Sequence, residues 1–272
     1  SDWSSDVCSS DLSESSLKRW ADEGRVNVTR TVGGHRRINL ADAVKFIRNE
    51  GLTVVRPDLL GLTGAEGAAA GEAVEAEADR EALLAALKSG DGAAARQMVL
   101  GWYIANRGLA DIYDGPVRWA MCEIGKLWVH REEGIFLEHR ATDLCVQAIS
   151  QIRGLIPAAG DRAPVAIGGA PSTDPYLLPS LMASTIFAEL GYHAENLGPD
   201  LPLNQFAQAA EHYNARVVWL SLTGVGDRSA AGRQVAQLDE QLAERDTTLV
   251  VGGQRCREIG RASCRERVCH RV

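Results

Sequence analysis

The sequence predicts a multi-domain α and α/β protein with a small helix-and-hairpin domain, a four-helix bundle and a doubly wound parallel sheet. Three observations carry this prediction. A basic segment near the N-terminus has a helix, hairpin, helix pattern, the middle of the chain has helical periodicity, and after residue 163 short β-rich runs alternate with helical stretches. With 272 residues, 45% of them apolar, the chain can form two or three small domains with their own cores.

The charge balance and the cysteines exclude several classes of protein. The chain has 29 Lys and Arg against 36 Asp and Glu, a net charge of −7, so contact with nucleic acid must be local. No run approaches the roughly 18 apolar residues of a membrane span, and residues 1–12 do not resemble a secretory signal. The six cysteines lack metal-ligand or disulfide-framework spacing. We therefore expect a cytoplasmic protein with reduced thiols, no metal site and no membrane partner.

Both ends differ from the rest of the chain. Residues 1–12 are rich in Ser and Asp, residues 257–272 are rich in Arg and Cys, and neither segment shows periodicity. Both resemble peptides that are translated from sequencing-adapter DNA, so we expect both to be non-native. Ordinary disordered tails are the alternative.

Residues 13–50 have the order of elements of a winged helix-turn-helix domain. Eight Lys and Arg stand against five Asp and Glu, which is +3 in a chain of −7. Ser13 can cap a first helix, and Gly24 can end it with a left-handed residue. The double glycine at 33 and 34 supplies positive φ angles for a hairpin turn, and Asn39 can cap a second helix.

The same segment resembles the recognition helix and wing of the MerR family of transcriptional regulators. The family's pattern of Leu-x-x-Trp, Gly and Arg-Thr-x-Gly-Gly-x-Arg-Arg is matched by Leu17, Trp20, Gly24, Arg30, Thr31, Gly33, Gly34, Arg36 and Arg37. The resemblance implies double-stranded DNA as a partner, contacted by Ser16, Lys18, Arg19, Arg30, Thr31, His35, Arg36 and Arg37. The family's first helix should precede residue 13, so we expect a truncated domain. A solvated charged surface on a small structural domain is the alternative.

The rest of the chain divides by composition and period. Residues 51–82 turn rich in Gly, Ala and Glu and are expected to be a linker, or a helix at their C-terminal end. Two apolar stripes within residues 83–157 predict the four-helix bundle. Over residues 158–256 the β-rich runs 165–167, 193–197, 217–222 and 248–251 predict a doubly wound, Rossmann-like parallel sheet. Such a sheet normally continues past its fourth strand, so we expect its C-terminal part to be missing.

The bundle carries one group of candidate site residues. Glu138 and His139 follow Trp128 after nine residues, with Gly134 between two helices. On the residues alone, a Trp in an apolar stripe is more often core, and a Glu near a helix N-terminus is favoured by the dipole. The segment GKLWVHREEGIFLEHRAT resembles the helical cap of cobalamin-binding photoreceptor regulators of the CarH and LitR type. The resemblance implies that Trp128, Glu138 and His139 enclose the upper face of adenosylcobalamin, with His139 able to reach cobalt after light removes the adenosyl group.

The sheet domain resembles cobalamin-binding domains of the methionine-synthase type. Those carry Asp (or Glu)-x-His-x-x-Gly after the first strand, Ser-x-Thr (or Leu) about forty residues later, and Gly-Gly after the fourth strand. Here DPYLLP at 174–179 takes the first place, 41 residues separate it from Ser221, and Thr223 and the double glycine at 252 and 253 follow. The resemblance implies cobalamin bound by Asp174, Tyr176, Ser221, Thr223, Gly252 and Gly253, its nucleotide tail inserted at the strand ends.

One position departs from that pattern. Tyr176 stands where the lower cobalt ligand of the family, a histidine, should be, and Pro179 replaces the motif's glycine. A neutral phenol is a poor replacement for imidazole. Three alternatives stay open: cobalamin with its own base or water on cobalt, a different ligand, or no ligand.

Together the three segments predict a bacterial transcriptional regulator, without catalytic residues, in which a cobalamin controls DNA affinity through a change in homo-oligomeric state. The resemblance of the bundle to the CarH and LitR type implies adenosylcobalamin as its form. One alternative is a cobalamin-independent regulator that uses the same fold for another ligand or for protein interaction. Another is a corrinoid protein of a methyltransferase, which would share the bundle and the sheet.

Overall fold

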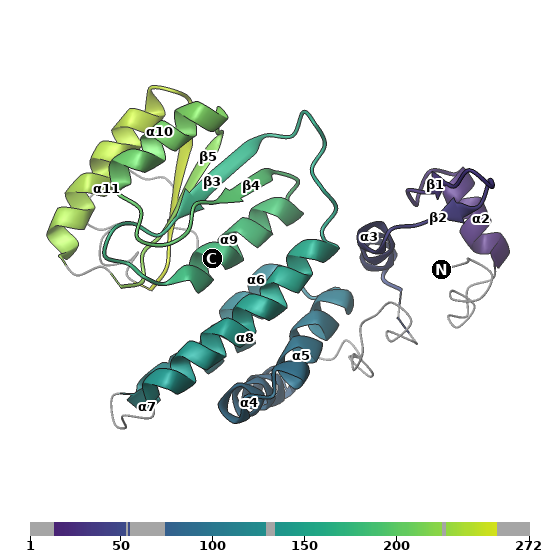
Figure 1. The fold of residues 1–272 in the computed structure, drawn as a ribbon, viewed down its shortest axis with the longest axis horizontal. Helices are drawn as coiled ribbons and strands as arrows, with labels where there is room; N and C mark the ends of the chain where they lie inside the picture. The colour runs from purple at the N-terminus through teal and green to yellow at the C-terminus, as the bar shows by residue number, and fades with distance from the viewer. Residues whose placement is uncertain (1–13, 53, 55–73, 129–133, 225–226, 255–272) are drawn as a thin grey trace. The chain divides into compact units, whose positions relative to one another are not determined.

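The computed structural model describes residues 14–52, 54, 74–128, 134–224 and 227–254 (Figure 1). The chain divides into two compact units, Ser1–Pro157 and Ala158–Val272. The expected adapter-like segments, 1–12 and 257–272, and the expected cap residue Ser13 lie outside the described residues. Of the helices described, none is both long and apolar enough to cross a membrane.

The first unit begins with the expected helix, hairpin and helix. Helix α2 spans Glu14–Asp22, and Gly24 follows it with a left-handed φ of 71°. Strands β1 (Thr29–Arg30) and β2 (Arg36–Arg37) pair antiparallel. Helix α3 (Leu40–Glu50) begins after Asn39, whose side chain accepts a hydrogen bond from the backbone N–H of Asp42. The predicted elements and the Asn39 cap are confirmed, whereas the complete winged helix-turn-helix stays a prediction.

The hairpin turn differs from the sequence prediction in one respect. Of the two glycines expected to have positive φ angles, only Gly34 has one, at 79°. The turn closes through the backbone N–H of Gly34, which donates to the carbonyl of Thr31 at 2.8 Å. One left-handed residue is therefore enough for this turn.

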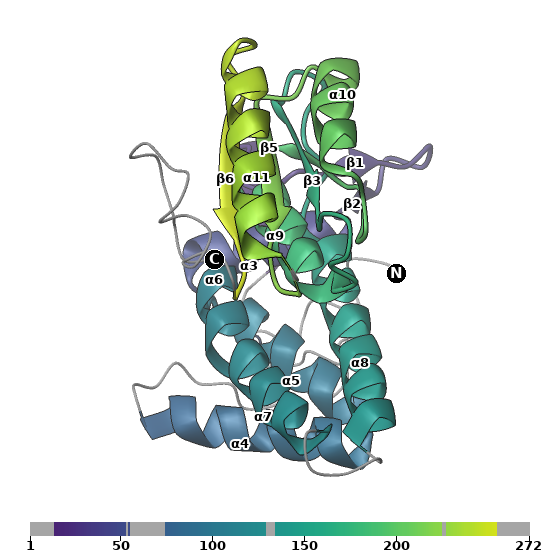
Figure 2. The ribbon, with the colours of Figure 1, turned by 90° about the vertical axis from the view of Figure 1, so that its left-hand side faces the viewer.

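Four long helices make up most of the rest of the first unit. They are α4 (Val74–Ser89), α5 (Gly92–Ile104), α7 (Arg118–Trp128) and α8 (Gly134–Leu155). Between α5 and α7 lie the short helix α6 (Leu109–Ile112) and the π-helical turn η2 (Tyr113–Val117), where Pro116 interrupts the helical hydrogen bonds. Figure 2 shows α4 running across α5, α7 and α8. Because α4 starts at Val74, the end of the segment expected to be a linker is helical.

The second unit is built on a four-stranded parallel sheet. Its strands are β3 (Val165–Gly169), β4 (His193–Asn196), β5 (Val217–Ser221) and β6 (Thr248–Gly252), in the order β4-β3-β5-β6. Helices α9 (Leu177–Glu189), α10 (Leu203–Tyr213) and α11 (Arg228–Ala243) connect them. The expected strands and their parallel arrangement are confirmed.

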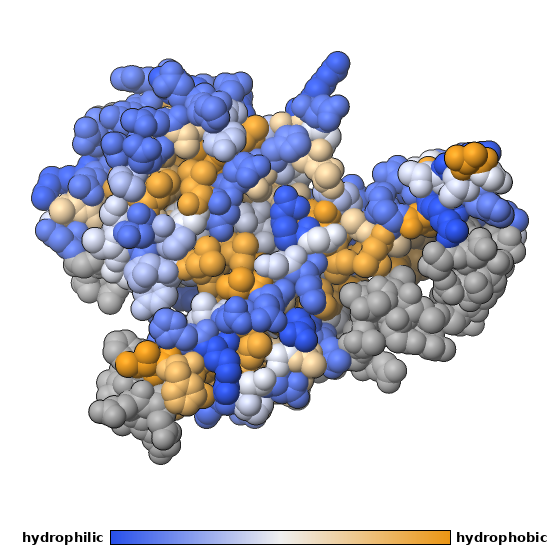
Figure 3. All heavy atoms as spheres, in the orientation of Figure 1, coloured by the Kyte–Doolittle hydropathy of each residue, from blue (hydrophilic) through white to orange (hydrophobic). Residues whose placement is uncertain are grey.

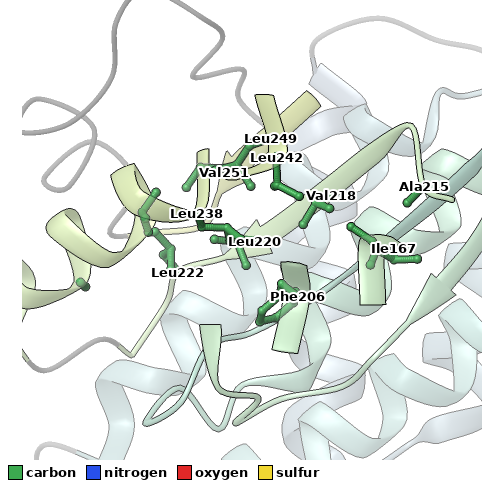
Figure 4. Close-up of a cluster of buried hydrophobic side chains, with 13 residues drawn as sticks. Ile167, Phe206, Ala215, Val218, Leu220, Leu222, Leu238, Leu242, Leu249 and Val251 are labelled. Atoms are coloured by element: carbon green, nitrogen blue, oxygen red, sulfur yellow. The ribbon is translucent and has the colours of Figure 1, made fainter. Parts of the chain in front are cut away.

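Helices cover both faces of this sheet. On one face Phe206 of α10 and Leu238 of α11 pack with Ile167, Val218 and Leu220 of the strands (Figure 4). The outward faces of α10 and α11 are mostly hydrophilic (Figure 3). On the other face Ala183 and Phe187 of α9 pack against Ala166, Val217 and Trp219. Because strand side chains alternate between faces, the residues of β5 that point toward α9 are Val217, Trp219 and Ser221.

Candidate ligand site at the carboxyl ends of the parallel strands

Asp174 joins the loops that follow β3 and β5. Its carboxylate is fully buried, and Oδ2 accepts hydrogen bonds from the backbone N–H of Thr223 at 2.5 Å and of Gly224 at 2.9 Å. The other oxygen, Oδ1, accepts from the backbone N–H of Tyr176 at 3.2 Å. The structure thus brings Asp174, Tyr176 and Thr223 together, while their role in binding a cofactor stays a prediction. Asp174 acts there as a positioning residue, because three backbone amides of the two loops donate to its carboxylate oxygens.

Two hydroxyl groups at the end of β5 are buried and have no hydrogen-bond partner in the part of the chain that the structure describes. Ser221 is the last residue of the strand, and Thr223 follows two positions later. Neither Ser221 Oγ nor Thr223 Oγ1 has a hydrogen-bond partner among the described residues. A buried hydroxyl without a hydrogen-bond partner lowers the stability of the fold by about 1–3 kcal/mol. Such groups therefore usually bind a ligand or an ordered water. These two oxygen atoms are the strongest indication of a binding site in the second unit.

The double glycine at the end of β6 lies beside these hydroxyls. Ser221 is paired with Gly252 in the sheet register, and the backbone N–H of Leu222 donates to the Gly252 carbonyl at 2.8 Å. A Cβ atom on Gly253 would lie 2.6 Å from the Leu222 carbonyl oxygen, and Gly253 has a φ of 99°. Gly253 is therefore required by the packing of the two strand ends. Among the described residues, a Cβ atom on Gly252 would meet nothing within 4 Å.

Tyr176 occupies the position just before α9. Its side chain is 40% exposed, and its ring lies against the loop after β5, since a Cβ atom on Gly224 would come within 2.8 Å of Tyr176 Cε2. The residues at this place supply a phenol and no imidazole. They therefore do not fit the lower cobalt ligand that the family resemblance implies, whereas the hydroxyls of Ser221 and Thr223 fit a large polar ligand.

The bundle residues implied to cap cobalamin belong to the first unit. Glu138 and His139 lie in the first two turns of α8, which begins at Gly134 as expected; Glu138 is partly exposed and His139 is exposed. Trp128 ends α7, and its side chain lies outside the part of the chain that the structure describes. Their role in a cofactor site stays a prediction. Among the described residues, no three His, Cys, Asp or Glu side chains gather closely enough to hold a metal ion.

The residues expected to contact DNA lie on α2 and on the hairpin. Lys18 and Arg19 are exposed on α2 and Ser16 is partly exposed, and Arg30, Thr31 and His35 are exposed around the hairpin turn. The hairpin is tied to α2 by Arg36, which donates to an Asp22 carboxylate oxygen at 2.5 Å and to the Lys18 carbonyl at 3.2 Å. Arg36 thus has an intramolecular partner, and Arg37 is partly buried.

Three residues of the second unit that lie near the candidate ligand site were not identified from the sequence. Trp219 Nε1 donates to Ser180 Oγ at 3.0 Å, and Ser180 Oγ donates to Asn196 Oδ1 at 2.8 Å. Asn196 also accepts from the backbone N–H of Gly198 at 3.1 Å. The sequence signal was a bulky indole inside an otherwise small and aliphatic strand, VVWLS. Periodicity places such a residue in the core but does not show which space it fills.

Comparison with known proteins finds similarity to corrinoid and cobalamin proteins. The chain is 24% identical over 149 residues, 53% of its own length and 68% of the relative's, to the dimethylamine corrinoid protein of Methanosarcina barkeri. Among solved structures, the monomethylamine corrinoid protein of M. barkeri matches with a TM-score of 0.48 and 16% identity, covering 68% of this chain and 90% of that one. A cobalamin-binding protein from Desulfitobacterium hafniense DCB-2 matches with a TM-score of 0.32 and 17% identity, covering 66% and 89%. No protein-family model matches the chain.

Proposed function

We propose that this protein is a DNA-binding transcriptional regulator whose activity is controlled by cobalamin, with adenosylcobalamin as the form that the resemblance of the bundle implies. The observation that carries the proposal is the pair of buried hydroxyls of Ser221 and Thr223 at the carboxyl end of β5, which have no partner among the described residues. Ligands bind at this edge in open parallel α/β sheets. The similarity to a corrinoid protein supports cobalamin as the ligand.

The DNA-binding half of the proposal rests on the basic segment 13–50. Lys18, Arg19 and Arg30 project from a helix and a hairpin whose relative position is held by Arg36 and Asp22. A helix can enter the major groove while a hairpin contacts the adjacent backbone. The protein would act in the cytoplasm as a homo-oligomer, without a catalytic step of its own, and the ligand would change its oligomeric state.

A visible absorption spectrum tests the ligand half of the proposal. The full chain is incubated with adenosylcobalamin in the dark, freed of unbound ligand by gel filtration, and its spectrum is recorded. We expect retained corrinoid colour, and about tenfold weaker binding by Ser221→Ala, because one hydrogen bond to the ligand is lost. Thr248→Ala, at the opposite and exposed end of a strand, is the control and should bind as the parent does. A colourless parent protein would contradict the proposal.

Selection of DNA fragments from a random duplex library tests the other half. We expect the full chain to enrich a defined sequence, and Arg30→Ala to bind it more weakly because a cationic contact to DNA is removed. A colourless protein that still selects DNA would show the cobalamin-independent regulator, in which the fold serves another ligand or a protein partner.

A corrinoid protein that serves a methyltransferase is the second candidate. One observation favours it, the 149-residue similarity to the dimethylamine corrinoid protein. The two candidates share corrinoid binding and differ in DNA binding. A chain that retains corrinoid and enriches no DNA sequence would favour the methyltransferase partner.

A further inference from the structure

The interior of the second unit directly below the two hydroxyls is filled by Trp219. Because Trp219 and Ser221 are two residues apart on β5, both point to the α9 face, with Trp219 deeper in the sheet. The indole is 2% exposed and stacks on Phe187 of α9, with ring centroids 5.2 Å apart and planes at 21°. Its N–H donates to Ser180 of the same helix. The ring is therefore held by both a stack and a hydrogen bond.

The indole also lies across the neighbouring strand. Gly168 of β3 is the partner of Trp219 in the parallel register, and a Cβ atom on Gly168 would lie 2.3 Å from Trp219 Cδ2. The ring thus occupies the space of a side chain on β3 as well as its own. A flat group that entered past Ser221 and followed β5 inward on this face would meet the indole.

The polar atoms available to a ligand consequently lie at the strand ends and not deeper. Ser221 Oγ and Thr223 Oγ1 have no partner among the described residues, whereas the inner polar atoms of Ser180 and Asn196 already bond to each other. The rim of a corrin ring carries amide side chains, which can donate to and accept from hydroxyl groups. Contacts of this kind need no insertion of a ligand group into the sheet.

We propose that this site holds a corrinoid by the amide rim of its ring and does not insert the nucleotide base beside β5. The ligand class is then a corrinoid whose base either stays on its own cobalt or is absent. This inference rests on the proposed function, because it specifies the ligand of the same site. The resemblance to cobalamin-binding domains implies that the Ser221 hydroxyl contacts the nucleotide tail, and the present proposal differs from this.

Comparison of hydroxocobalamin with diaquocobinamide, which has no nucleotide base, tests this inference on the full chain. Affinities are measured by equilibrium dialysis. We expect the two dissociation constants to differ by less than about threefold. Ser221→Ala should weaken the binding of both ligands by the same factor, because the hydroxyl contacts a part that both possess. Thr248→Ala is the control and should change neither.

Two results would overturn the inference, and they are distinguishable. Cobalamin bound more than about a hundredfold tighter than cobinamide, with Ser221→Ala weakening only cobalamin, would show that the base is inserted. The proposed function would then stand. If neither corrinoid is retained, the proposed function fails and this inference fails with it.

A second measurement supports the inference directly. In the reduced cob(II)alamin complex, electron paramagnetic resonance should show the splitting that arises when a nitrogen of the nucleotide base is bound to cobalt.

Discussion

At the scale of single residues, the Asp174 carboxylate organises the candidate site. It accepts three backbone N–H groups, from Tyr176, Thr223 and Gly224. Asp174→Asn removes the charge and one acceptor oxygen, so we expect the free energy of unfolding to fall by about 1.5–3 kcal/mol. Urea unfolding measures this change, with Asp161→Asn at an exposed turn as the control. Equal stability of the two variants would contradict a positioning role for Asp174.

Ser221 of β5 and Ser180 of α9 are two buried serines that can be compared directly, because both lie between α9 and the sheet. The Ser221 hydroxyl has no partner among the described residues, whereas Ser180 accepts from Trp219 and donates to Asn196. Without ligand, we expect Ser221→Ala to leave the stability unchanged or raise it by about 1 kcal/mol, and Ser180→Ala to lower it by about 1–3 kcal/mol. Thermal unfolding of both variants checks the prediction. A large loss of stability in Ser221→Ala would show that its hydroxyl is bonded inside the protein.

The buried thiol of Cys145 makes the free energy of unfolding depend on pH. Burial in α8 raises the pKa of this thiol from 9.0 to about 12, because the thiolate is poorly solvated there. The unfolded chain therefore loses this proton at a lower pH than the folded chain, so the stabilising contribution is present below pH 9 and is lost as the pH rises toward 12. Cys145→Ala should flatten this part of the stability curve, as measured by urea unfolding at pH 8 to about 10. Unchanged curvature would contradict the assignment.

At the scale of elements, α3 is joined to the long helices of its unit through Arg48. The guanidinium lies 3.8 Å from the centroid of the Tyr103 ring and donates to the carbonyls of Tyr103 and Arg107. Arg48→Ala should loosen α3, so we expect hydrogen exchange of the α3 amides to be about tenfold faster, with α9 unchanged. Lys45→Ala, exposed on the same helix, is the control. Identical exchange in the two variants would show that Arg48 does not hold α3.

Local signals explain which elements could be predicted from the sequence. The β-rich runs predicted the four strands, and Asn39 predicted the start of α3. Both predictions succeeded because strand formation and helix capping depend on residues that are neighbours in the sequence. The family motif included both Asp174 and Thr223, which lie together in the structure because both follow parallel strands that end at one edge of the sheet. Spacing could not show that the Asp174 carboxylate bonds to backbone amides, nor that Trp219 covers Gly168, because these contacts join segments far apart in the sequence. The hydrogen bond between Arg36 and Asp22 was also not predicted, because hydrophobic periodicity does not show how a hairpin packs on the preceding helix.

At the scale of the whole molecule, the proposed function requires the candidate ligand site to be coupled to the basic segment 13–50, which is proposed to bind DNA. Coupling between two binding equilibria is reciprocal: if cobalamin changes the affinity for DNA by some factor, DNA must change the affinity for cobalamin by that factor. A change of oligomeric state on ligand binding would supply the two states that such coupling needs. The prediction holds for an activator and for a repressor alike.

Two titrations of the full chain measure this coupling. The affinity for a selected duplex is measured with and without adenosylcobalamin, and the affinity for adenosylcobalamin with and without the duplex, all in the dark at one salt concentration. We expect the two ratios to agree and to lie between about fivefold and 150-fold. Ser221→Ala should require a higher ligand concentration for the same shift, because it weakens ligand binding without altering the basic segment 13–50. If ligand saturation leaves both the oligomeric state and the DNA affinity unchanged, ligand and DNA bind independently and the proposed control of DNA binding by this ligand is wrong.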